Sequence, residues 1–563
     1  FIQIRRFLYK LEVLLLKNKI TQEPADYELT SRIVAESGIP SDRHHLGKIL
    51  LQSFKDDPDF VLQIDGATGE SETYASALER TVRCANCLKN LGLEHGDVLL
   101  LMAPNHLDVA IPFYAALYLG VIVGAVDRTL TTNELQHTFA FSKPKIIFCQ
   151  SDRASDIQLT LNNLNLDAQI VSFDKGDYLC SFEDFMEQYG GDSSVEDFKC
   201  TDFDPEDSAA FLIATSGTTG LPKAAAITHK NFITITPYLR NRFPRNRFTT
   251  FPTPTRLALI GAPLQWLTAI INFIIGPILK FSRLQTPQKM TLEHAYDLIN
   301  TYRPTYTIFS PTLMTTLINP DERDRCDFTS LELLMLGGSA VPQKLMDELK
   351  VYTEVVNVYG MSELGGIAFH GDNPAPGSCG KPMGCFQYRI IDVETQQDIY
   401  EPNVPGELWI KGPSVFKEYY NNVEATEETF AEDRWFKTGD TFYRDENWNF
   451  FFVERIKLLL KYKSYQISPV EIEGVIRQHP GVLDVAVTGV PDDECGDLPV
   501  ACVVPRQGAE PSADEIKDWV KESLSDAKQL RGGVIFVDAI PMTASTKVHR
   551  RKLKQMALEM PRE

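Results

Sequence analysis

The stretch that decides the fold runs from residue 211 to residue 229 and reads FLIATSGTTGLPKAAAITH. Residues 215–220 within it comprise three threonines, one serine and two glycines, and they directly follow an apolar run. Glycine lets main-chain amides approach a ligand closely, and hydroxyl groups donate hydrogen bonds to anionic oxygens. The stretch therefore predicts a loop that cradles phosphate. It differs from the Walker A loop, which ends in Gly-Lys-Ser or Gly-Lys-Thr, because Lys223 follows a proline and precedes an alanine.

Length and composition indicate a large globular protein. The 563 residues predict roughly three to four domains or subdomains. Hydrophobic residues make up 43% of the chain and charged residues 23%, so large cores can be buried. The formal net charge of −20 repels phosphate backbones, and we therefore expect no nucleic-acid partner.

The ten cysteines are scattered along the chain. Cys84 and Cys87 form a CxxC motif, but residues 76–92 around them read as an amphipathic helix, and no second pair stands at zinc spacing. We expect free, packed thiols rather than a metal site, as in a reducing compartment.

Two apolar stretches, residues 109–126 and 257–279, carry no charge and are long enough to raise the question of a membrane span. Prolines and glycines interrupt both, which favours buried strand and helix pairs, so we expect no stable membrane span. Residues 1–20 carry five basic residues and one acidic residue and predict an amphipathic surface helix rather than a signal peptide.

The pattern divides the chain into an N-terminal extension (1–45), a large domain (46–453) and a small domain (454–563). The large domain alternates short apolar runs with helical patterns, as α/β proteins do, and strands are predicted within 97–104, 144–150, 168–173 and 304–310. In the small domain, helices are predicted to begin after the capping residues Ser468 and Ser512, and strands within 482–490, 499–505 and 533–540.

Six ordered motifs join the octet SGTTGLPK: LGGSA (336–340), VYGMSE (358–363), GELWIKGPSVFKEYYNN (406–422), WFKTGD (435–440), VERIKLLLKYKSYQISPVEIE (453–473) and PMTASTKVHRR (541–551). With them, residues 46–558 resemble the adenylate-forming superfamily of acyl-CoA synthetases, 4-coumarate–CoA ligases and luciferases. The sequences of the motifs are most similar to those of insect luciferase-like acyl-CoA synthetases. The implied fold is a large N-terminal domain of α/β subdomains with a small β-barrel-like subdomain, followed by a small mobile α+β domain.

The resemblance implies a two-step reaction. ATP and a carboxylic acid give an acyl-AMP and pyrophosphate, and the acyl group then passes to a thiol, usually that of coenzyme A. ATP, Mg²⁺ and coenzyme A are the implied cofactors or co-substrates, and the partner is a small-molecule acid. The apolar content around residues 261–270 and 306–313 favours a fatty or aryl acid.

The resemblance also assigns roles to individual residues. The phosphate-side residues are Thr215, Ser216, Gly217, Thr218, Thr219, Gly220 and Lys223, with Thr218 also among the catalytic residues. The adenine-side residues are Gly338, Ser339, Ala340, Tyr359 and Gly360. Ser362 faces the α-phosphate, Asp440 and Arg455 bind the ribose, and Glu363 holds the metal. Lys547 serves adenylation and Lys461 the thioester step, Trp266 and His229 line the acid pocket, and Glu454 is the hinge.

Three positions depart from the family pattern: Thr546 and Ser464 stand where glycine is usual, as does Ala224. Two alternatives therefore stay open. One is an adenylating enzyme with another acceptor, either oxygen, as in a luciferase, or a carrier-protein thiol; the other is a relative that binds acyl groups or nucleotides without turnover. The C-terminus, Pro561-Arg562-Glu563, does not match a Ser-Lys-Leu peroxisomal signal, so the cytoplasm is expected over the peroxisome. The sequence carries no signal of oligomeric state.

Overall fold

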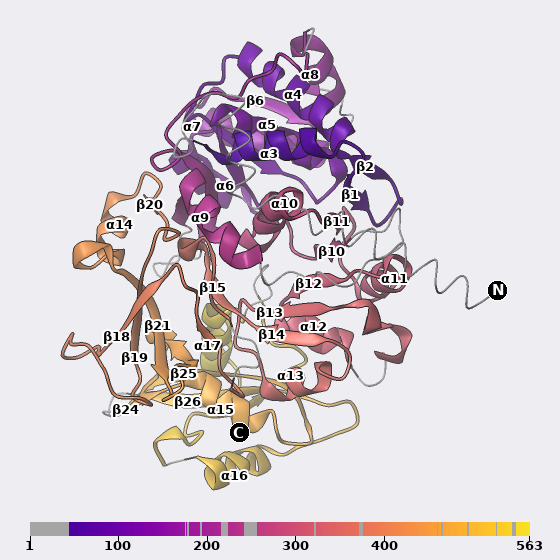
Figure 1. The fold of residues 1–563 in the computed structure, drawn as a ribbon. Helices are drawn as coiled ribbons and strands as arrows, with labels where there is room; N and C mark the ends of the chain where they lie inside the picture. Colours follow the sequence, from indigo (N-terminus) through magenta and orange to yellow (C-terminus); the bar gives the residue numbers. More distant parts are fainter. Residues whose placement is uncertain are drawn as a thin grey trace.

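The structure is a computed structural model (Figure 1). It describes residues 44–174, 176, 180–191, 194–215, 223–240, 256–319, 323–370, 375–458, 460–462, 465–492, 495–524, 526–542 and 548–563.

An eight-stranded sheet forms the first part of the large domain, in the order β20-β9-β8-β4-β3-β5-β6-β7. Its strands are β3 (Val98–Met102), β4 (Ile122–Ala125), β5 (Ile146–Cys149), β6 (Gln169–Ser172), β7 (Cys180–Ser181), β8 (Ala209–Thr215), β9 (Lys223–Thr228) and β20 (Glu418–Tyr419). The pairs β8–β9 and β9–β20 are antiparallel, and the other neighbours are parallel. Strand β20 comes last in the sequence among these eight strands. It pairs with β9 although it lies about 190 residues further along the chain.

A seven-stranded sheet forms the second part, in the order β14-β13-β12-β10-β11-β1-β2. Its strands are β1 (Val61–Asp65), β2 (Ser71–Thr73), β10 (Leu257–Leu259), β11 (Ser282–Gln285), β12 (Tyr306–Phe309), β13 (Leu333–Leu336) and β14 (Glu354–Asn357). All neighbours except β1–β2 are parallel.

Helices cover both faces of both sheets, and one helical layer is shared between them. The shared layer comprises α3 (Leu46–Asp56), α4 (Tyr74–Asn90), α5 (Ala110–Leu119), α8 (Phe182–Tyr189), α9 (His229–Arg240) and α10 (Leu267–Leu279). Helices α6 (Thr132–Ser142) and α7 (Ala154–Leu164) cover the outer face of the first sheet, and α11 (Leu292–Tyr302), α12 (Pro311–Leu317) and α13 (Gln343–Leu349) that of the second. Strand β3 explains this arrangement, because Leu99 and Leu101 face the shared layer while Val98, Leu100 and Met102 face the outer one.

Two antiparallel sheets complete the large domain. One contains β15 (Tyr359–Met361), β16 (Gly366–His370) and β17 (Lys381–Pro382); the other contains β18 (Gln387–Ile391), β19 (Gly406–Lys411), β21 (Phe436–Arg444) and β22 (Phe450–Arg455). The short helix α14 (Val423–Thr429) packs near β20 and β21. These sheets, drawn in orange, lie against the α/β part of the molecule (Figure 1).

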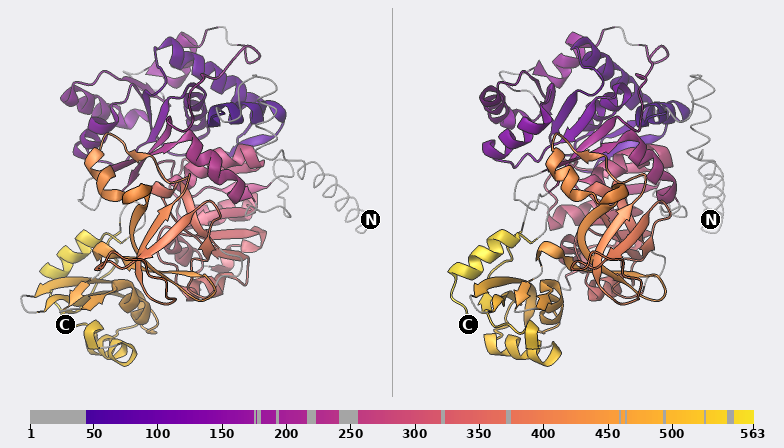
Figure 2. Two further views of the ribbon diagram at one scale, coloured as in Figure 1. Left: turned by 60° about the vertical axis from the view of Figure 1, so that its left-hand side comes forward. Right: turned by 90° about the vertical axis from the view of Figure 1, so that its left-hand side faces the viewer.

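The small domain has its own core around the strands β23 (Leu460–Tyr462), β24 (Tyr465–Ile467), β25 (Val482–Asp492), β26 (Gly496–Pro505) and β27 (Gly533–Phe536). Its helices are α15 (Pro469–Ile476), α16 (Ala513–Ser523) and α17 (Arg550–Glu559). The predicted capping residues are confirmed, since Ser468 and Ser512 accept hydrogen bonds from the amides of Glu471 and Glu515. Figure 2 shows this domain, in yellow, at one end of the molecule. The α/β fold class with a small α+β C-terminal domain is confirmed.

The two apolar stretches are internal. The first contains all of α5 and β4, and the second contains β10 and α10, with nearly all of their side chains buried. Among the described residues there is no helix with the length and apolar character that crossing a membrane requires. The predicted helix around Cys84 and Cys87 is α4, and both thiols are free and buried.

Candidate functional site

The ends of β13 and β14 bring the first predicted site residues together. The two strands are parallel, with Leu336 beside Asn357, so the segments after them leave the same edge of the sheet. The predicted adenine-side residues Gly338, Ser339 and Ala340 follow β13 and are exposed, and Tyr359 follows β14. Gly338 has φ of +89°, which favours glycine.

Gly360 needs the absence of a side chain for a different reason. A Cβ atom there would lie 2.2 Å from the carbonyl oxygen of Gly366 on the paired strand β16. The close pairing of β15 and β16 fixes the turn between them, the 3-10 helix η6 (Ser362–Leu364), which carries Ser362 and Glu363. Ser362 is half-buried and Glu363 is buried.

Tyr359, Asp440 and Arg455 form one hydrogen-bonded cluster. The Tyr359 hydroxyl donates to Oδ2 of Asp440 at 2.7 Å, and Nε of Arg455 lies 2.9 Å from Oδ1. Asp440 and Arg455 face each other as paired residues of β21 and β22, whereas Tyr359 comes from β15. Only 2% of Asp440 is exposed, so the carboxylate is held by partners from two sheets.

Burial and neighbouring charges shift the pKa values of Tyr359 and Arg455 in this cluster. Removal of the hydroxyl from water, together with the Asp440 carboxylate, raises the pKa of Tyr359 well above its usual value, so Tyr359 stays protonated and donates. The same carboxylate raises the pKa of Arg455, and Tyr359 and Glu363 add to that effect. The Glu363 carboxylate is therefore close enough to Arg455 to influence its pKa.

Glu363, Tyr419 and Lys223 form a second group beside the first. The Tyr419 hydroxyl donates to Oε1 of Glu363 at 2.8 Å, and Nζ of Lys223 lies 5.2 Å from the centre of the Tyr419 ring. Burial raises the pKa of Tyr419, and the Glu363 carboxylate raises it further. Strand pairing explains the meeting, because Tyr419 on β20 lies opposite Ala225 on β9.

The predicted phosphate loop closes the β8–β9 hairpin. Thr215 and Lys223 are register partners at its mouth, and the Thr215 hydroxyl lies 3.5 Å from the carbonyl oxygen of Lys223. The loop residues Ser216, Gly217, Thr218, Thr219 and Gly220 lie outside the described residues. Ala224, one of the three departures, is buried in β9 opposite Ala214 and packs into the core.

Trp266 lies at the N-cap of the apolar helix α10 and is half-buried. The loop before it is fixed by Asn105, whose amide donates to the carbonyl of Ala262 at 2.8 Å and accepts the amide of Leu264 at 3.1 Å. Helix α10 packs against β16, the strand that follows Glu363. Trp266 thus lies at the start of a helix that contacts β16.

His229 lies elsewhere, at the opposite end of β9 from Lys223. It is fully buried, and its ring packs against His45 at 5.5 Å and Phe203 at 4.9 Å. His95 stacks on the same phenylalanine at 4.9 Å. Six residues of extended chain place His229 about 20 Å from Lys223. The assignment of His229 to the acid pocket stays a prediction.

The small domain contributes residues that lie largely outside the description. Lys461 belongs to β23, but its side chain is not described, and Ser464, Thr546 and Lys547 are outside the described residues. Residues 543–547 are flanked by a β-bridge between Met542 and Val548.

The predicted hinge residue, Glu454, is buried, and its Oε1 accepts the amide of Arg455 at 2.9 Å. Burial raises the pKa of Glu454. The Glu454 carboxylate is thus adjacent to the cluster of Tyr359, Asp440 and Arg455 in both sequence and space.

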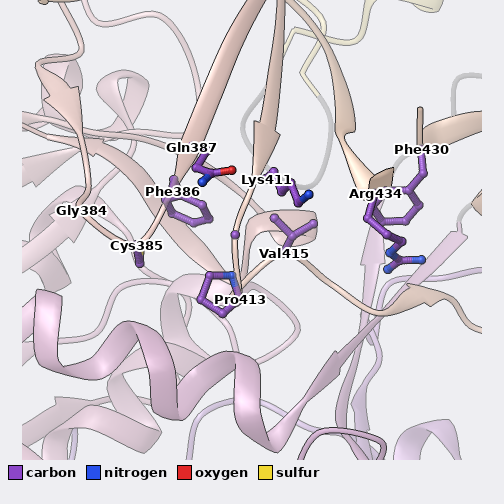
Figure 3. Close-up of a pocket in the computed structure, with 10 residues that line it drawn as sticks. Gly384, Cys385, Phe386, Gln387, Lys411, Pro413, Val415, Phe430 and Arg434 are labelled. Carbon is purple, nitrogen blue, oxygen red and sulfur yellow. The ribbon is translucent and has the colours of Figure 1, made fainter. Parts of the chain in front are cut away.

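A separate cavity of about 460 Å³ lies at the start of β18 and the end of β19 (Figure 3). Lys411 and Arg434 line it, together with Phe386, Val415 and Phe430. Both cationic groups have partners within the protein: Lys411 pairs with Asp433 at 2.7 Å, and Arg434 donates to the carbonyl of Lys417 at 2.7 Å. None of the predicted site residues that the structure describes lines this cavity.

Tyr419 is the residue that sequence reasoning missed. It lies within the motif at 406–422, but no role followed from its position there. The only available signal was its place in that motif, because the pairing of β20 with β9 cannot be read from local pattern.

The chain is similar to known proteins over most of its length. The profile described as AMP-binding enzyme matches residues 51–420, and that described as AMP-binding enzyme C-terminal domain matches residues 471–547. Luciferin 4-monooxygenase of Photuris pensylvanica is 32% identical, covering 87% of this chain and 90% of the relative. 4-Coumarate-CoA ligase 1 of Narcissus pseudonarcissus is 30% identical, covering 91% and 93%. The crystal structure of ATP-bound MatB from Rhodopseudomonas palustris has the same fold, with a TM-score of 0.80 and 24% identity over 92% of this chain and 99% of that one.

Proposed function

The chain belongs to the AMP-binding enzyme family of adenylate-forming ligases, and from that premise we propose that it converts a hydrophobic carboxylic acid to an acyl-AMP and then to an acyl-CoA. The observation that carries the proposal is the convergence of Tyr359, Asp440 and Arg455 beside Glu363 and Lys223. These residues come from four strands and one turn of the large domain, and all were expected at one nucleotide site.

The ribose and the adenine bind at the first cluster in this proposal. A carboxylate can accept hydrogen bonds from two vicinal hydroxyls, and Asp440 has both oxygens directed toward polar partners. Arg455 pairs with the carboxylate and adds a donor for the sugar. The Tyr359 ring offers an adenine-stacking face, opposite the exposed backbone of Gly338, Ser339 and Ala340.

The phosphates bind between the β8–β9 hairpin and Glu363. Lys223 supplies a cation to the polyphosphate, and Thr215 lies across from it at the loop mouth. Ser362 offers a hydroxyl to the α-phosphate from the same turn as Glu363. The negative charges of the acid and of the polyphosphate repel each other, so fixed cations here stabilise the transition state.

Glu363 fits the role of a magnesium ligand. Mg²⁺ prefers oxygen ligands and is commonly held by one or two carboxylates together with substrate phosphates. Glu363 is a buried carboxylate with one oxygen already oriented by Tyr419, and the described residues contain no group of three or more candidate metal-binding side chains. When bound there, Mg²⁺ would offset charge on the polyphosphate.

The acid binds near Trp266 and helix α10. The helix is apolar along most of its length, and its position beside β16 leads from the nucleotide-side turn into the core. Such a lining suits a fatty or aryl tail better than a polar one. Lys547 and then Lys461 would approach from the small domain, the first during adenylation and the second during transfer to coenzyme A.

An acid panel tests the proposal. Fatty acids of graded length and cinnamate-type acids are incubated with ATP and Mg²⁺, and AMP release is measured with and without coenzyme A. We expect coenzyme A to accelerate AMP release with at least one hydrophobic acid, and Lys547→Ala to abolish adenylation while ATP binding persists. No ATP–pyrophosphate exchange with any acid would contradict the proposal and favour a non-catalytic binding protein.

One alternative has specific support, because a luciferin 4-monooxygenase is among the similar proteins. If the acceptor is oxygen, adenylation of luciferin would be followed by light emission without coenzyme A. Measuring light with luciferin, ATP and oxygen in parallel with the acid panel separates the two acceptors.

A further inference from the structure

Tyr419 lies between two residues of opposite charge, both assigned to the nucleotide in the proposed function. Its hydroxyl donates to Oε1 of Glu363, and its ring faces the ammonium of Lys223. Only 8% of Tyr419 is exposed, and its ring packs against Phe416 at 4.8 Å. Its position is fixed further by Thr426, whose hydroxyl accepts the Tyr419 amide at 3.0 Å.

The segment around Tyr419 is also tied to Glu363 through the backbone. The amide of Phe416 donates to the carbonyl oxygen of Glu363 at 2.8 Å, and the amide of Tyr420 donates to the carbonyl of Ala224 at 2.8 Å. Side chain and main chain of residues 416–420 therefore hold Glu363 and the start of β9 as one unit.

A lysine and a glutamate this near a common partner would be expected to pair with each other. Yet no ion pair within 4.0 Å joins Lys223 to Glu363, although both side chains are described. Tyr419 gives each charge a different partner: the ring attracts the ammonium, and the hydroxyl takes one carboxylate oxygen. Oε2 of Glu363 accepts no hydrogen bond from any described residue.

We propose that Tyr419 is a positioning residue that keeps Lys223 and Glu363 apart, so that the ammonium stays available to phosphate and Oε2 stays available to a divalent cation. The inference rests on the proposed nucleotide site and adds a residue to it. It predicts that the hydroxyl and the ring have separable effects. Loss of the hydroxyl should weaken metal binding, and loss of the ring should weaken binding of the phosphates.

Tyr419→Phe removes the hydroxyl and keeps the ring. Binding of Mn²⁺, used as a paramagnetic probe for the metal site, is followed by electron paramagnetic resonance in the presence of the non-hydrolysable analogue α,β-methylene-ATP. We expect the Mn²⁺ dissociation constant to rise about 10-fold, as for other residues that orient a metal ligand. Binding of the analogue in EDTA, measured by calorimetry, should change less than twofold.

Tyr419→Leu removes both groups. Lys223 can then pair with Glu363, so we expect weaker Mn²⁺ binding and, in EDTA, a further loss of about threefold in affinity for the analogue. Tyr420→Phe is the matched control, because it removes a hydroxyl from the next residue, which no predicted site residue contacts. It should leave both constants unchanged. Thermal unfolding of each variant checks that the fold is retained.

Two results would overturn the inference, and they are distinguishable. If the unmodified protein binds neither the analogue nor Mn²⁺, the proposed function fails and the inference fails with it. If the unmodified protein binds both and folded Tyr419→Phe matches Tyr420→Phe, only the inference is wrong, and Tyr419 is a packing residue.

Discussion

Lys223 at the start of strand β9 and His229 just past its end lie six residues apart and have opposite environments. At the first end, Lys223 is half-buried, faces the ring of Tyr419 and lies beside the ionisable Glu363. At the other end, His229 is fully buried among His45, His95 and Phe203. One continuous sequence motif thus contains a charged end suited to a ligand and a neutral end suited to a core.

The difference teaches how a ligand-binding hairpin can be held in place. Burial lowers the pKa of His229 far below its usual value and that of His45 to about 3, so both rings are neutral at neutral pH and pack as flat apolar groups. That packing fixes the far end of β9 in the shared helical layer. Lys223 then extends from a rigid strand, so its ammonium group can be held in one orientation.

The strongest test of the comparison is Lys223→Ala. Removing the cation should lower kcat/KM for adenylation by 100-fold or more, which corresponds to about 3 kcal/mol of transition-state stabilisation. ATP–pyrophosphate exchange gives the rate, and calorimetry should show little change in the unfolding midpoint. Lys230→Ala, just beyond His229, is the matched control and should retain activity. A large loss of stability in Lys223→Ala would contradict the division of roles along the strand.

The opposite end should respond in the opposite way. His229→Ala leaves a cavity in a fully buried position and should lower the free energy of unfolding by about 3 kcal/mol, with the specific activity of folded protein unchanged. Both ring nitrogens lack hydrogen-bond partners among the described residues, so His229→Phe should cost much less. Urea unfolding provides the comparison. A His229→Phe variant as unstable as His229→Ala would show that the nitrogens, not the packing, matter.

Asn231 connects the two environments and should show an intermediate effect. Its side chain accepts the amide of Thr228 and donates to the carbonyls of Pro413 and Val415, just before the segment that carries Tyr419. Asn231→Ala leaves these buried groups without partners, and we expect a loss of about 2 kcal/mol in the free energy of unfolding. A modest fall in adenylation rate should accompany it. Activity that is fully retained would indicate that the two ends are independent.

The change in the free energy of unfolding with pH should be the smallest of these effects when it is expressed per pH unit. The folded pKa of His45 is about 3 and the ordinary value is 6.5, so below pH 6.5 the unfolded chain binds a proton that the folded chain does not. The contribution of neutral His45 to stability is then fully present above pH 6.5 and falls by about 1.4 kcal/mol per pH unit between 6.5 and 3. The lowered pKa of His229 acts in the same direction. His44, His95 and Lys48 also face His45 and oppose its protonation.

Urea unfolding between pH 7.5 and 5 measures this slope. His229→Phe should be less sensitive to acid than the unmodified protein, because one buried neutral histidine is gone. An equal slope in both proteins would place the acid-sensitive groups elsewhere.

Local pattern was sufficient for much of the fold. Ser468 and Ser512 were found as helix caps because capping uses residues close in sequence. The strand runs were visible because each is a short apolar segment. The hydrogen bond between Tyr359 and Asp440 joins residues 81 apart, so only resemblance to a known family could suggest it.

Tyr419 was not identified from the sequence, because its place depends on the pairing of β20 with β9, almost 200 positions apart. Contacts between residues so far apart along the chain cannot be read from local sequence pattern.

The double engagement of Asp440 has a consequence for sugar selectivity. Oδ2 of Asp440 accepts the Tyr359 hydroxyl, and Oδ1 lies 2.9 Å from Nε of Arg455. Each oxygen keeps a further lone pair, so in the proposed function a ribose can donate one hydroxyl to each oxygen, whereas 2′-deoxyribose can donate only one. ATP should therefore bind more tightly than 2′-deoxy-ATP.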